Sequence, residues 1–399
     1  MSDPEIDLVT ITDRCETALE WARENDYAGW DPYDGLSSSV LPDGNWLFRL
    51  CTLHAVRIAP FNVRPIAGIA TERNPKGIAL FALAYLDLYE VTGEETHLSS
   101  ATELLDWLLR NTSPASTEPS WGYNFDWQNG REFFLPAYHP SIVVSVFCGR
   151  AFLRYYEVTG DDRALEVASG VCRFVRCEIG QERVDGYRVY AYTPYDSFVV
   201  VNVNALAAGF FAEVAAHTDD GGLGHRADRL AEFVCDQQVE DGAWYYASPP
   251  ERSHISHDNF HTGFVVESLD RYMAARQPAE GVERAYERGL DFYREALFEP
   301  DGAPRYEHDR PYPQDVHAAA QAVITFARPR AESTAIAERV LAWTLSNLYD
   351  SEGYFYRQRG RFLTDRTPYI RWSQGWMCLA LASYLRRTAK SWQPAVERR

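Results

Sequence analysis

Lysine is almost absent from this sequence of 399 residues. Only Lys76 and Lys390 are lysines, so 37 of the 39 basic residues are arginines, and 57 acidic residues give a net charge of −18. A surface of that charge repels nucleic acid and anionic lipid, so we expect neither as a partner. An acidic surface with so little lysine indicates a halophile, whose salt-rich cytoplasm screens the repulsion. A GC-rich genome that favours arginine codons is the alternative.

Long apolar runs and cysteine clusters are also missing. No stretch of about 18 uncharged apolar residues is present to span a bilayer. The opening string MSDPEIDLVT has no basic region followed by an apolar one, as a signal peptide would. We therefore expect a cytoplasmic protein without a membrane span. The seven cysteines form no CxxC pair and no Cys/His cluster, so we expect neither a zinc site nor a disulfide framework.

Motifs for common cofactors are absent as well. The glycines of Gly221-Gly222-Leu223-Gly224 precede a predicted helix without a strand before it, which argues against a dinucleotide site and a sugar-nucleotide dehydrogenase. The pair Asp219-Asp220 lies at a predicted turn, without the acidic cluster that a terpene cyclase would need. We expect no cofactor and no metal.

One short string occurs twice. Tyr-Glu-Val-Thr-Gly ends at Gly93 and again at Gly160. In both copies an apolar helix ends at the glycine, which can adopt the left-handed conformation, and an amphipathic helix follows at once. Each copy therefore predicts a tight αα-hairpin, and the pair predicts a repeat architecture.

The same unit continues along the chain. Apolar helical patterns begin near Lys76, Ser141, Phe198, Asn259, Val316 and Trp372. Amphipathic patterns alternate with them over 7–24, 98–109, 164–175, 223–237, 281–297 and 331–348. Helices that are apolar all round form an inner ring, and amphipathic helices form an outer one. The sequence thus predicts an all-α, (α/α)6 toroid with twelve main helices and more than half of all residues helical. We expect one domain over 1–390 and a charged tail over 391–399.

Aromatic loops precede the inner helices, for example over 121–127, 186–192, 244–246 and 354–356. Six hairpins with such loops resemble the six-hairpin glycosidase superfamily, which includes uronyl hydrolases, sugar epimerases and polysaccharide lyases. The strings Trp30-Asp-Pro-Tyr-Asp-Gly35, Asp258-Asn-Phe-His-Thr-Gly263 and Arg371-Trp-Ser-Gln-Gly375 resemble a narrower group found with surface-polysaccharide genes. Its haloarchaeal branch is associated with N-glycosylation of the S-layer glycoprotein. The resemblance implies a protein that supplies or modifies a hexuronic acid of an N-linked glycan.

Ionisable residues stand at the starts of the inner helices, where unpaired N–H groups and the helix dipole favour an anion such as a sugar carboxylate. Asp196, Asp258 and Asp315 are candidate carboxylates for hydrolysis, although aspartate is also a preferred helix N-cap. His261 and His317 occupy matching places in neighbouring repeats. Two imidazoles that exchange protons with a sugar ring are suited to an isomerase or epimerase. The alternative is that they are core histidines.

Candidate binding residues lie in the loops and helix starts around the same end of the toroid: His139, Tyr138, Tyr195, Trp127, Trp244, Asn259, Arg371 and Trp372. Arg371 is expected to clamp a carboxylate, and the aromatic rings to stack on sugars, unless they are a surface charge and loop packing. Lys76 joins them because a lysine that survives among arginines does what a guanidinium cannot, unless it was retained by chance. Asp31 and Asp34 rank second, as residues able to reach the rim.

These features favour an enzyme of glycan assembly that acts on a hexuronic acid, free or linked to a nucleotide or a lipid. The leading hypothesis is a sugar isomerase or epimerase. A glycoside hydrolase of the unsaturated glucuronyl hydrolase type is the alternative, and a non-catalytic glycan-binding protein is the second alternative. The oligomeric state stays open.

The excess of acidic residues predicts a dependence of stability on salt. We expect the melting temperature to rise from low to molar KCl, because ions screen the repulsion among carboxylates. Thermal unfolding followed by circular dichroism at both salt concentrations tests this. Equal melting temperatures would contradict the halophile interpretation.

Overall fold

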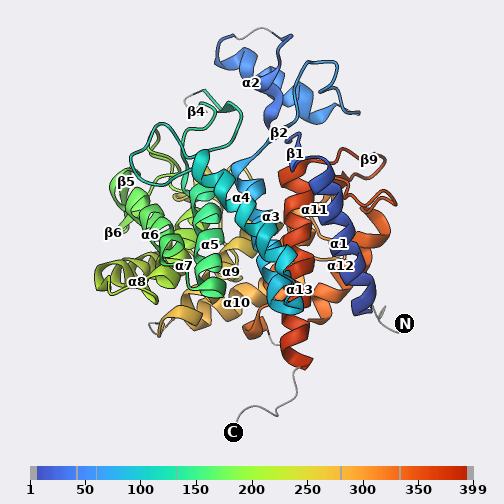
Figure 1. Cartoon of the computed structure of the whole chain (residues 1–399). Coiled ribbons are helices and arrows are strands. Elements are labelled where there is room, and N and C mark those ends of the chain that lie inside the picture. The colour runs from blue at the N-terminus through green and yellow to red at the C-terminus, as the bar shows by residue number, and fades with distance from the viewer. Residues whose placement is uncertain are drawn as a thin grey trace.

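The computed structural model describes residues 7–41, 44–59, 61–131, 133–278, 281–331 and 334–392. Helices make up 57% of the chain, which confirms the all-α prediction. Six of them form an inner ring (Figure 1): α3 (Pro75–Thr92), α5 (Ile142–Thr159), α7 (Val201–Ala215), α9 (Asn259–Ala275), α11 (Val316–Phe326) and α13 (Trp376–Trp392). Each inner helix packs against the next, and α13 packs against α3, so the ring closes.

An outer helix packs against each inner one. The outer helices are α1 (Leu8–Glu24), α4 (Glu95–Arg110), α6 (Asp162–Cys177), α8 (Gly221–Asp236), α10 (Val282–Ala296) and α12 (Ala335–Asn347). Five hairpins join helices that are consecutive in sequence, whereas the sixth pairs α1 with α13. The two ends of the chain therefore complete the toroid together, as Figure 1 shows for the blue and red helices.

Local sequence explains where the hairpins turn. Gly93 and Gly160 end α3 and α5 with φ angles of 70° and 75°, in the left-handed region that glycine adopts without strain. At the other end of α3, Asn74 accepts hydrogen bonds from two backbone N–H groups, and Pro75 occupies the first helical turn. The hairpins predicted from the repeated string are confirmed.

The strands are short and lie in the loops before the inner helices. They are β1 (Ala28–Gly29), β2 (Glu72–Arg73), β3 (Trp127–Asn129), β4 (Phe133–Leu135), β5 (Gln181–Val184), β6 (Tyr187–Tyr190), β7 (Gln314–Asp315), β8 (Gln358–Arg359) and β9 (Thr364–Asp365). They pair as three antiparallel hairpins or ribbons and one three-stranded sheet, β7-β8-β9. These ribbons stiffen the loops without forming a core.

One helix of the described chain has no counterpart in the predicted twelve. Helix α2 (Trp46–Ile58) begins at Asn45, whose side chain accepts from the N–H groups of Leu47 and Phe48. It stands above the end of the toroid where the inner helices begin (Figure 1). We name residues 35–71, which include α2, the α2 lobe. Helix α2 was not predicted because it lies outside the repeat of alternating apolar and amphipathic helices.

Three further features can be described. All seven cysteines are free thiols. Of the helices described, none is both long and apolar enough to cross a bilayer. Helix α13 continues to Trp392, two residues into the tail expected over 391–399, and the rest of that tail lies outside the described residues.

A buried ionic network joins the inner helices at the end of the toroid opposite α2. Arg271 of α9 donates to Glu267 at 2.7 Å and to Glu213 of α7 at 2.8 Å. Burial alone would raise the pKa of Glu267, but the guanidiniums of Arg271, Arg150 and Arg328 outweigh it and lower that pKa to about 2. A second cavity of about 540 Å³ lies among these charges.

This network predicts how stability falls in acid. Because the pKa of Glu267 is depressed by folding, its contribution is present above the unfolded value near 4.5 and is lost as pH falls towards 2. The contribution is on the order of 3 kcal/mol. We expect Glu267→Gln to lower the free energy of unfolding at pH 7 and to flatten its decline between pH 5 and pH 2.

Urea unfolding at several pH values measures this effect. Glu24→Gln, at an exposed position on α1, is the matched control and should leave the curve unchanged. An unaltered slope in Glu267→Gln would show that the network does not govern acid stability.

Candidate functional site

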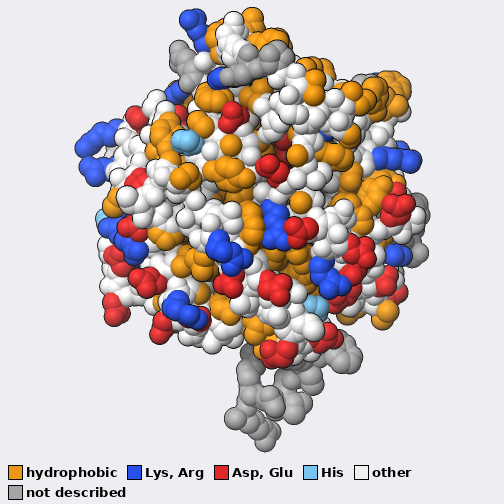
Figure 2. Space-filling view, turned by 45° about the horizontal axis from the view of Figure 1, so that its top comes forward, with side chains coloured by type: hydrophobic (Ala, Val, Ile, Leu, Met, Phe, Trp, Pro, Cys, Tyr) orange, Lys and Arg blue, Asp and Glu red, His pale blue; other side chains and the backbone are white. Residues whose placement is uncertain are grey.

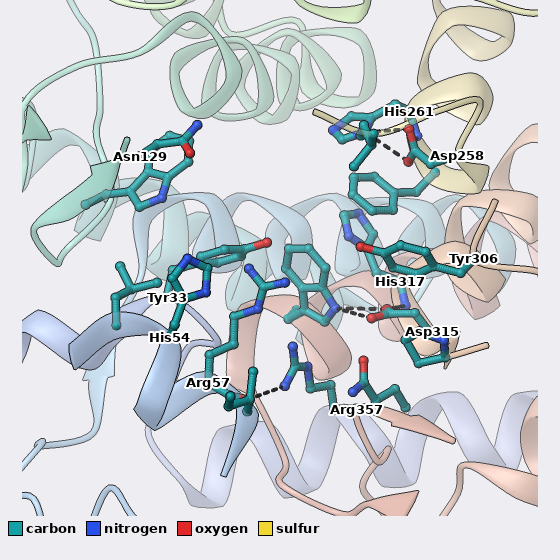
Figure 3. A pocket seen from close by; sticks show the side chains of 18 of the residues that line it. Tyr33, His54, Arg57, Asn129, Asp258, His261, Tyr306, Asp315, His317 and Arg357 are labelled. Carbon is teal, nitrogen blue, oxygen red and sulfur yellow. Dashed lines mark hydrogen bonds and ion pairs between the residues drawn. The ribbon is translucent and has the colours of Figure 1, made fainter. Parts of the chain in front are cut away.

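A cavity of about 740 Å³ opens where the inner helices begin. Its walls come from the starts of α3, α5, α7, α9 and α11, from the turn Ile370–Gly375 before α13, from the aromatic loops and from α2. In Figure 3, His261, Asp258, His317, Tyr306 and Asp315 lie on one side, facing Asn129, Tyr33 and His54 on the other. The cavity can hold one or two sugar rings.

His261 and Asp258 form a hydrogen-bonded pair at the start of α9. Asp258 is the N-cap and accepts from the backbone N–H of His261 at 3.3 Å. The same carboxylate lies 3.0 Å from His261 Nδ1. An ionised carboxylate only accepts hydrogen bonds, so this contact favours a proton on Nδ1, and in the neutral imidazole Nε2 then has the lone pair. His261 lines the cavity and presents this nitrogen as a base.

His317 has the matching position on α11 but a different environment. Its ring packs against Phe260 at 4.6 Å, Trp372 at 4.6 Å and Trp376 at 4.5 Å between ring centroids. Both ring nitrogens are buried without a hydrogen-bond partner, and burial, with nearby Lys76, holds the imidazole pKa well below its usual value. His317 is therefore neutral and covered.

Phe260 separates the two imidazoles. Its ring centroid lies 4.1 Å from that of His261 and is stacked on His317 with an interplanar angle of 20°. A sugar ring cannot occupy the same space, so the expectation that both histidines flank the sugar is not met in this arrangement. Proton exchange with His317 would require Phe260 or Trp372 to rotate.

Asp315 occupies the start of α11 and also lines the cavity. It caps the helix through the N–H of His317 at 2.8 Å and accepts from Trp372 Nε1 at 2.9 and 3.2 Å. Burial raises the pKa of the Asp315 carboxyl. The carboxylate thus holds Trp372 in the cavity wall.

Lys76 lies at the floor of the cavity, at the first turn of α3. Its Nζ is 4.2 Å from the ring centroid of Phe147, 4.9 Å from that of Trp376 and 5.4 Å from that of Phe264. The side chain is 2% exposed and has no ion-pair partner within the described part of the chain. Burial lowers its pKa well below the usual range, with Arg371 adding to the effect. A compact amine fits this aromatic box where a guanidinium would not.

Arg371 was expected to clamp a substrate carboxylate, but it is paired within the protein. Its Nε and Nη2 donate to the two oxygens of Asp31 at 2.6 and 2.8 Å, and both side chains are buried. The fork predicted to clamp a substrate carboxylate is thus occupied within the protein. Asp34 is likewise bonded to Arg64 at 2.7 Å. Asp31 and Asp34 are buried ion-pair partners and do not reach the rim.

Six candidates do not line the cavity: Asp196, His139, Tyr138, Tyr195, Trp244 and Asn259. Asp196 accepts from the backbone N–H groups of Tyr192, Thr193 and Phe198 and so closes a loop. Asn259 is buried and bonded to the carbonyl of Leu297.

The other four of these six residues, all with aromatic rings, lie outside the cavity wall. Trp244 is buried beneath α8, where its Nε1 donates to the carbonyl of Val234. His139 and Tyr195 pack against each other with ring centroids 5.4 Å apart, and Tyr195 is exposed. Tyr138 sits beside them with a φ of 61°. Trp127 and Trp372 do line the cavity as expected.

Several cavity residues were missed by the sequence analysis: Tyr33, His54, Arg57, Tyr246, His254, Tyr306, Arg310 and Arg357. His254 and His261 both pack on Tyr246, at 4.9 and 4.7 Å between ring centroids. Desolvation lowers the pKa of His254, and His261 adds to that shift, so a second neutral imidazole lies near the pair. Tyr33 and Tyr246 lie in strings that the sequence analysis noted, the string Trp30–Gly35 and the aromatic loop 244–246, whereas no local pattern marks the other six, which come from loops and from α2.

Cationic side chains outnumber carboxylates in the wall of the cavity, although the chain is acidic. Its wall carries Arg57, Lys76, Arg310, Arg357 and Arg371 but only Asp258, Asp315 and Asp365 as carboxylates. Arg310, Arg357 and Arg371 form ion pairs with Glu307, Asp365 and Asp31. Arg57 and Lys76 have no such partner in the part of the chain that the structure describes. The Arg57 guanidinium lies 5.2 Å from the centroid of the Tyr33 ring.

Comparison with known proteins supports the fold alone. Neither a protein-family model nor a curated protein matches this sequence. Among solved structures, cellobiose 2-epimerase from Bacillus thermoamylovorans B4167 is similar with a TM-score of 0.63 at 12% identity, over 94% of this chain and 98% of that one. An unsaturated glucuronyl hydrolase specific for heparin gives 0.59 at 13% identity, over 94% and 96%.

A D-mannose isomerase gives a TM-score of 0.60 at 11% identity, over 79% of this chain and 88% of that one. These structures place the chain in the class of (α/α)6 toroids found in sugar epimerases and glycoside hydrolases. One fold hosts several reactions, so the particular function must be argued from the site.

The pair at the start of α9 makes a testable prediction. We expect His261 to be the Nδ1–H tautomer, and Asp258→Asn to shift it towards the Nε2–H tautomer, because an amide can donate to Nδ1. Asparagine still caps the helix, so the free energy of unfolding should change by no more than about 1 kcal/mol. The ¹⁵N shifts of the labelled histidines measure the tautomer.

Asp161→Asn is the control, since Asp161 caps α6 in the same way and lies outside the cavity. It should leave every histidine signal in place. An unchanged His261 tautomer in Asp258→Asn would show that Asp258 is only a cap.

Proposed function

We propose that this protein is a sugar isomerase or epimerase that acts on a hexuronic acid. The observation that carries the proposal is a base, His261 oriented by Asp258, that opens on a cavity of sugar size whose wall also holds Arg57. A neutral sugar gives no reason for a guanidinium without an ion-pair partner in the described chain, whereas a uronate carboxylate does. The folds of the epimerases and the isomerase described above are compatible with this activity.

The chemistry requires one proton to move. In the open-chain sugar, the hydrogen on the carbon next to the aldehyde is acidic, and His261 Nε2 takes it as a general base. The electron pair passes to the carbonyl oxygen, giving an enediolate. Return of a proton to the other face of the same carbon gives the epimer. Its return to the former carbonyl carbon, with the hydroxyl proton of the second carbon passing to the oxygen of the first, gives the ketose.

The remaining residues have supporting roles in this proposal. Arg57 binds the carboxylate, which fixes the sugar relative to His261. His254 is the second neutral imidazole and is placed to deliver a proton near Tyr246. Trp127 and Trp372 offer apolar faces to the sugar. His317, although first expected to share the proton transfer, supports the wall in this arrangement.

The narrower setting rests on the sequence resemblance. The strings around Trp30, Asp258 and Arg371 resemble those of AglQ, a protein of haloarchaeal N-glycosylation, so the proposed process is glycan assembly. The sugar would then be free or linked to a nucleotide or lipid. A cytoplasmic location and a halophilic source belong to the same proposal.

One observation favours a second candidate, a glycoside hydrolase. Asp315 is a buried carboxyl whose pKa is raised, as a general acid requires, and Asp258 is a second carboxylate on the same wall. The fold of the unsaturated glucuronyl hydrolase is compatible with this reading. Both Asp315 oxygens, however, are close to Trp372 Nε1. A non-catalytic glycan-binding protein would keep the cavity and show neither reaction.

Isotope exchange distinguishes these activities. In D2O, D-glucuronate or D-mannuronate should lose the proton at carbon 2 by ¹H NMR as the epimer or ketose accumulates. His261→Gln should slow exchange by about 10²- to 10⁴-fold, because it removes the base. Arg57→Gln should chiefly raise KM for the uronate. His225→Gln, on the exposed face of α8, is the matched control.

Each alternative has its own result. Cleavage of an unsaturated glucuronyl disaccharide without exchange would replace the isomerase by the hydrolase. Full exchange in His261→Gln would remove His261 from the mechanism, and binding without either reaction would indicate a glycan-binding protein.

A further inference from the structure

Exposed apolar side chains concentrate around the mouth of the cavity. Of the large hydrophobic residues that are exposed in the described chain, ten belong to the α2 lobe or to the turn between β8 and β9: Val40, Leu41, Trp46, Leu47, Phe48, Ile58, Phe61, Ile66, Phe362 and Leu363. We name these ten residues the mouth surface. Phe362 is 88% exposed and Ile66 is 78% exposed, which is costly for isolated side chains of this size.

The two segments that carry the mouth surface meet at the cavity. Ile58 of α2 and Leu363 of the β8–β9 turn both line it. Arg357, beside β8, donates to the backbone carbonyl of Arg57 in α2 at 3.1 Å. Figure 2 shows hydrophobic side chains crowding the upper part of the molecule, where the α2 lobe projects, and most acidic side chains below them.

The charge of these segments is opposite to that of the protein. Residues 35–71 and 353–371 hold eight arginines and two acidic residues. Arg64, Arg357 and Arg371 are buried and paired with aspartates, whereas Arg359, Arg361 and Arg366 are exposed. Elsewhere acidic residues prevail, because the whole chain has a net charge of −18. An apolar surface fringed by arginine is complementary to a partner that is apolar and anionic.

A second copy of the chain does not fit this surface. A symmetric dimer would place the same patch on both sides of the interface, so arginines such as Arg361 would face arginines with few carboxylates between them. A lipid surface has no such conflict. Apolar side chains enter the boundary of the acyl chains while arginines reach the lipid phosphates.

We propose that the mouth surface docks on an anionic lipid bilayer, with the cavity opening towards the lipid. The acidic protein as a whole is repelled by an anionic bilayer, but this repulsion falls off over about 8 Å at physiological ionic strength and about 3 Å in molar salt. The mouth surface attracts lipid in direct contact, where such screening matters least. The docking goes beyond the proposed isomerase activity. If that activity also holds, a sugar linked to a lipid is the form that reaches His261 directly.

Binding to vesicles tests the docking without any sugar. The parent protein should co-sediment with vesicles of 70% phosphatidylcholine and 30% phosphatidylglycerol, and more weakly with phosphatidylcholine alone. Replacing Trp46, Leu47 and Phe48 together by serine should lower the partition coefficient at least about tenfold, since each large side chain contributes to burial. Arg361→Gln should weaken binding only to the anionic vesicles.

Two controls keep the result interpretable. Leu8→Ser with Val9→Ser removes exposed apolar side chains from α1 and should leave binding unchanged. Phe362→Ser with Leu363→Ser tests the same surface without altering α2, so a loss in both mouth variants with unchanged melting temperatures supports docking.

Other outcomes overturn the proposal. Absence of parent binding to the anionic vesicles would do so, and so would equal binding by parent and mouth variants. Light scattering that shows a parent dimer, dissociated by the mouth substitutions, would assign the surface to a second copy of the chain. None of these results depends on whether uronate exchange is observed.

Discussion

The buried ion pair between Asp31 and Arg371 is the interaction on which the cavity end of the toroid depends. It joins the loop after α1 to the π-helical turn Ile370–Gly375 that leads into α13, and so connects the two ends of the chain where the ring closes. The next residue in that turn, Trp372, is then held by Asp315 at the start of α11. A π turn of this kind is common at functional sites. Removing one partner would leave the other charge buried and unpaired, which typically costs about 3–5 kcal/mol.

Separation of charge explains how an acidic chain can keep cationic side chains in its cavity. The carboxylates of the wall already accept hydrogen bonds, Asp258 from His261 and Asp315 from Trp372, while Arg57 and Lys76 form no ion pair in the described chain. Excess negative charge elsewhere does not cancel this local field, because water and salt screen charges that lie a Debye length apart.

The fold could be predicted from the sequence because its signals are local. A glycine after an apolar helix, as at Gly93, defines a hairpin turn whatever surrounds it. The cavity was only partly predictable, because Asp196, Asp258 and Asp315 all precede a helix and give the same local sequence pattern. Asp258 and Asp315 are N-caps in the wall, whereas Asp196 closes a loop outside it. Arg57 could not be found, because the packing of α2 over the mouth is a tertiary property that no repeat or spacing reveals.

His261 and His317 show how neighbours, rather than position, decide whether a histidine can act. Both follow an N-capping aspartate on the first turn of an inner helix. Asp258 bonds the ring of His261 as well as its N–H, which turns the imidazole towards the cavity. Asp315 instead accepts a second hydrogen bond from Trp372 Nε1. The ring of His317 therefore has no polar partner and packs among aromatic rings, with Phe260 stacked on it. One hydrogen bond therefore separates an imidazole that opens on the cavity from one confined to its wall.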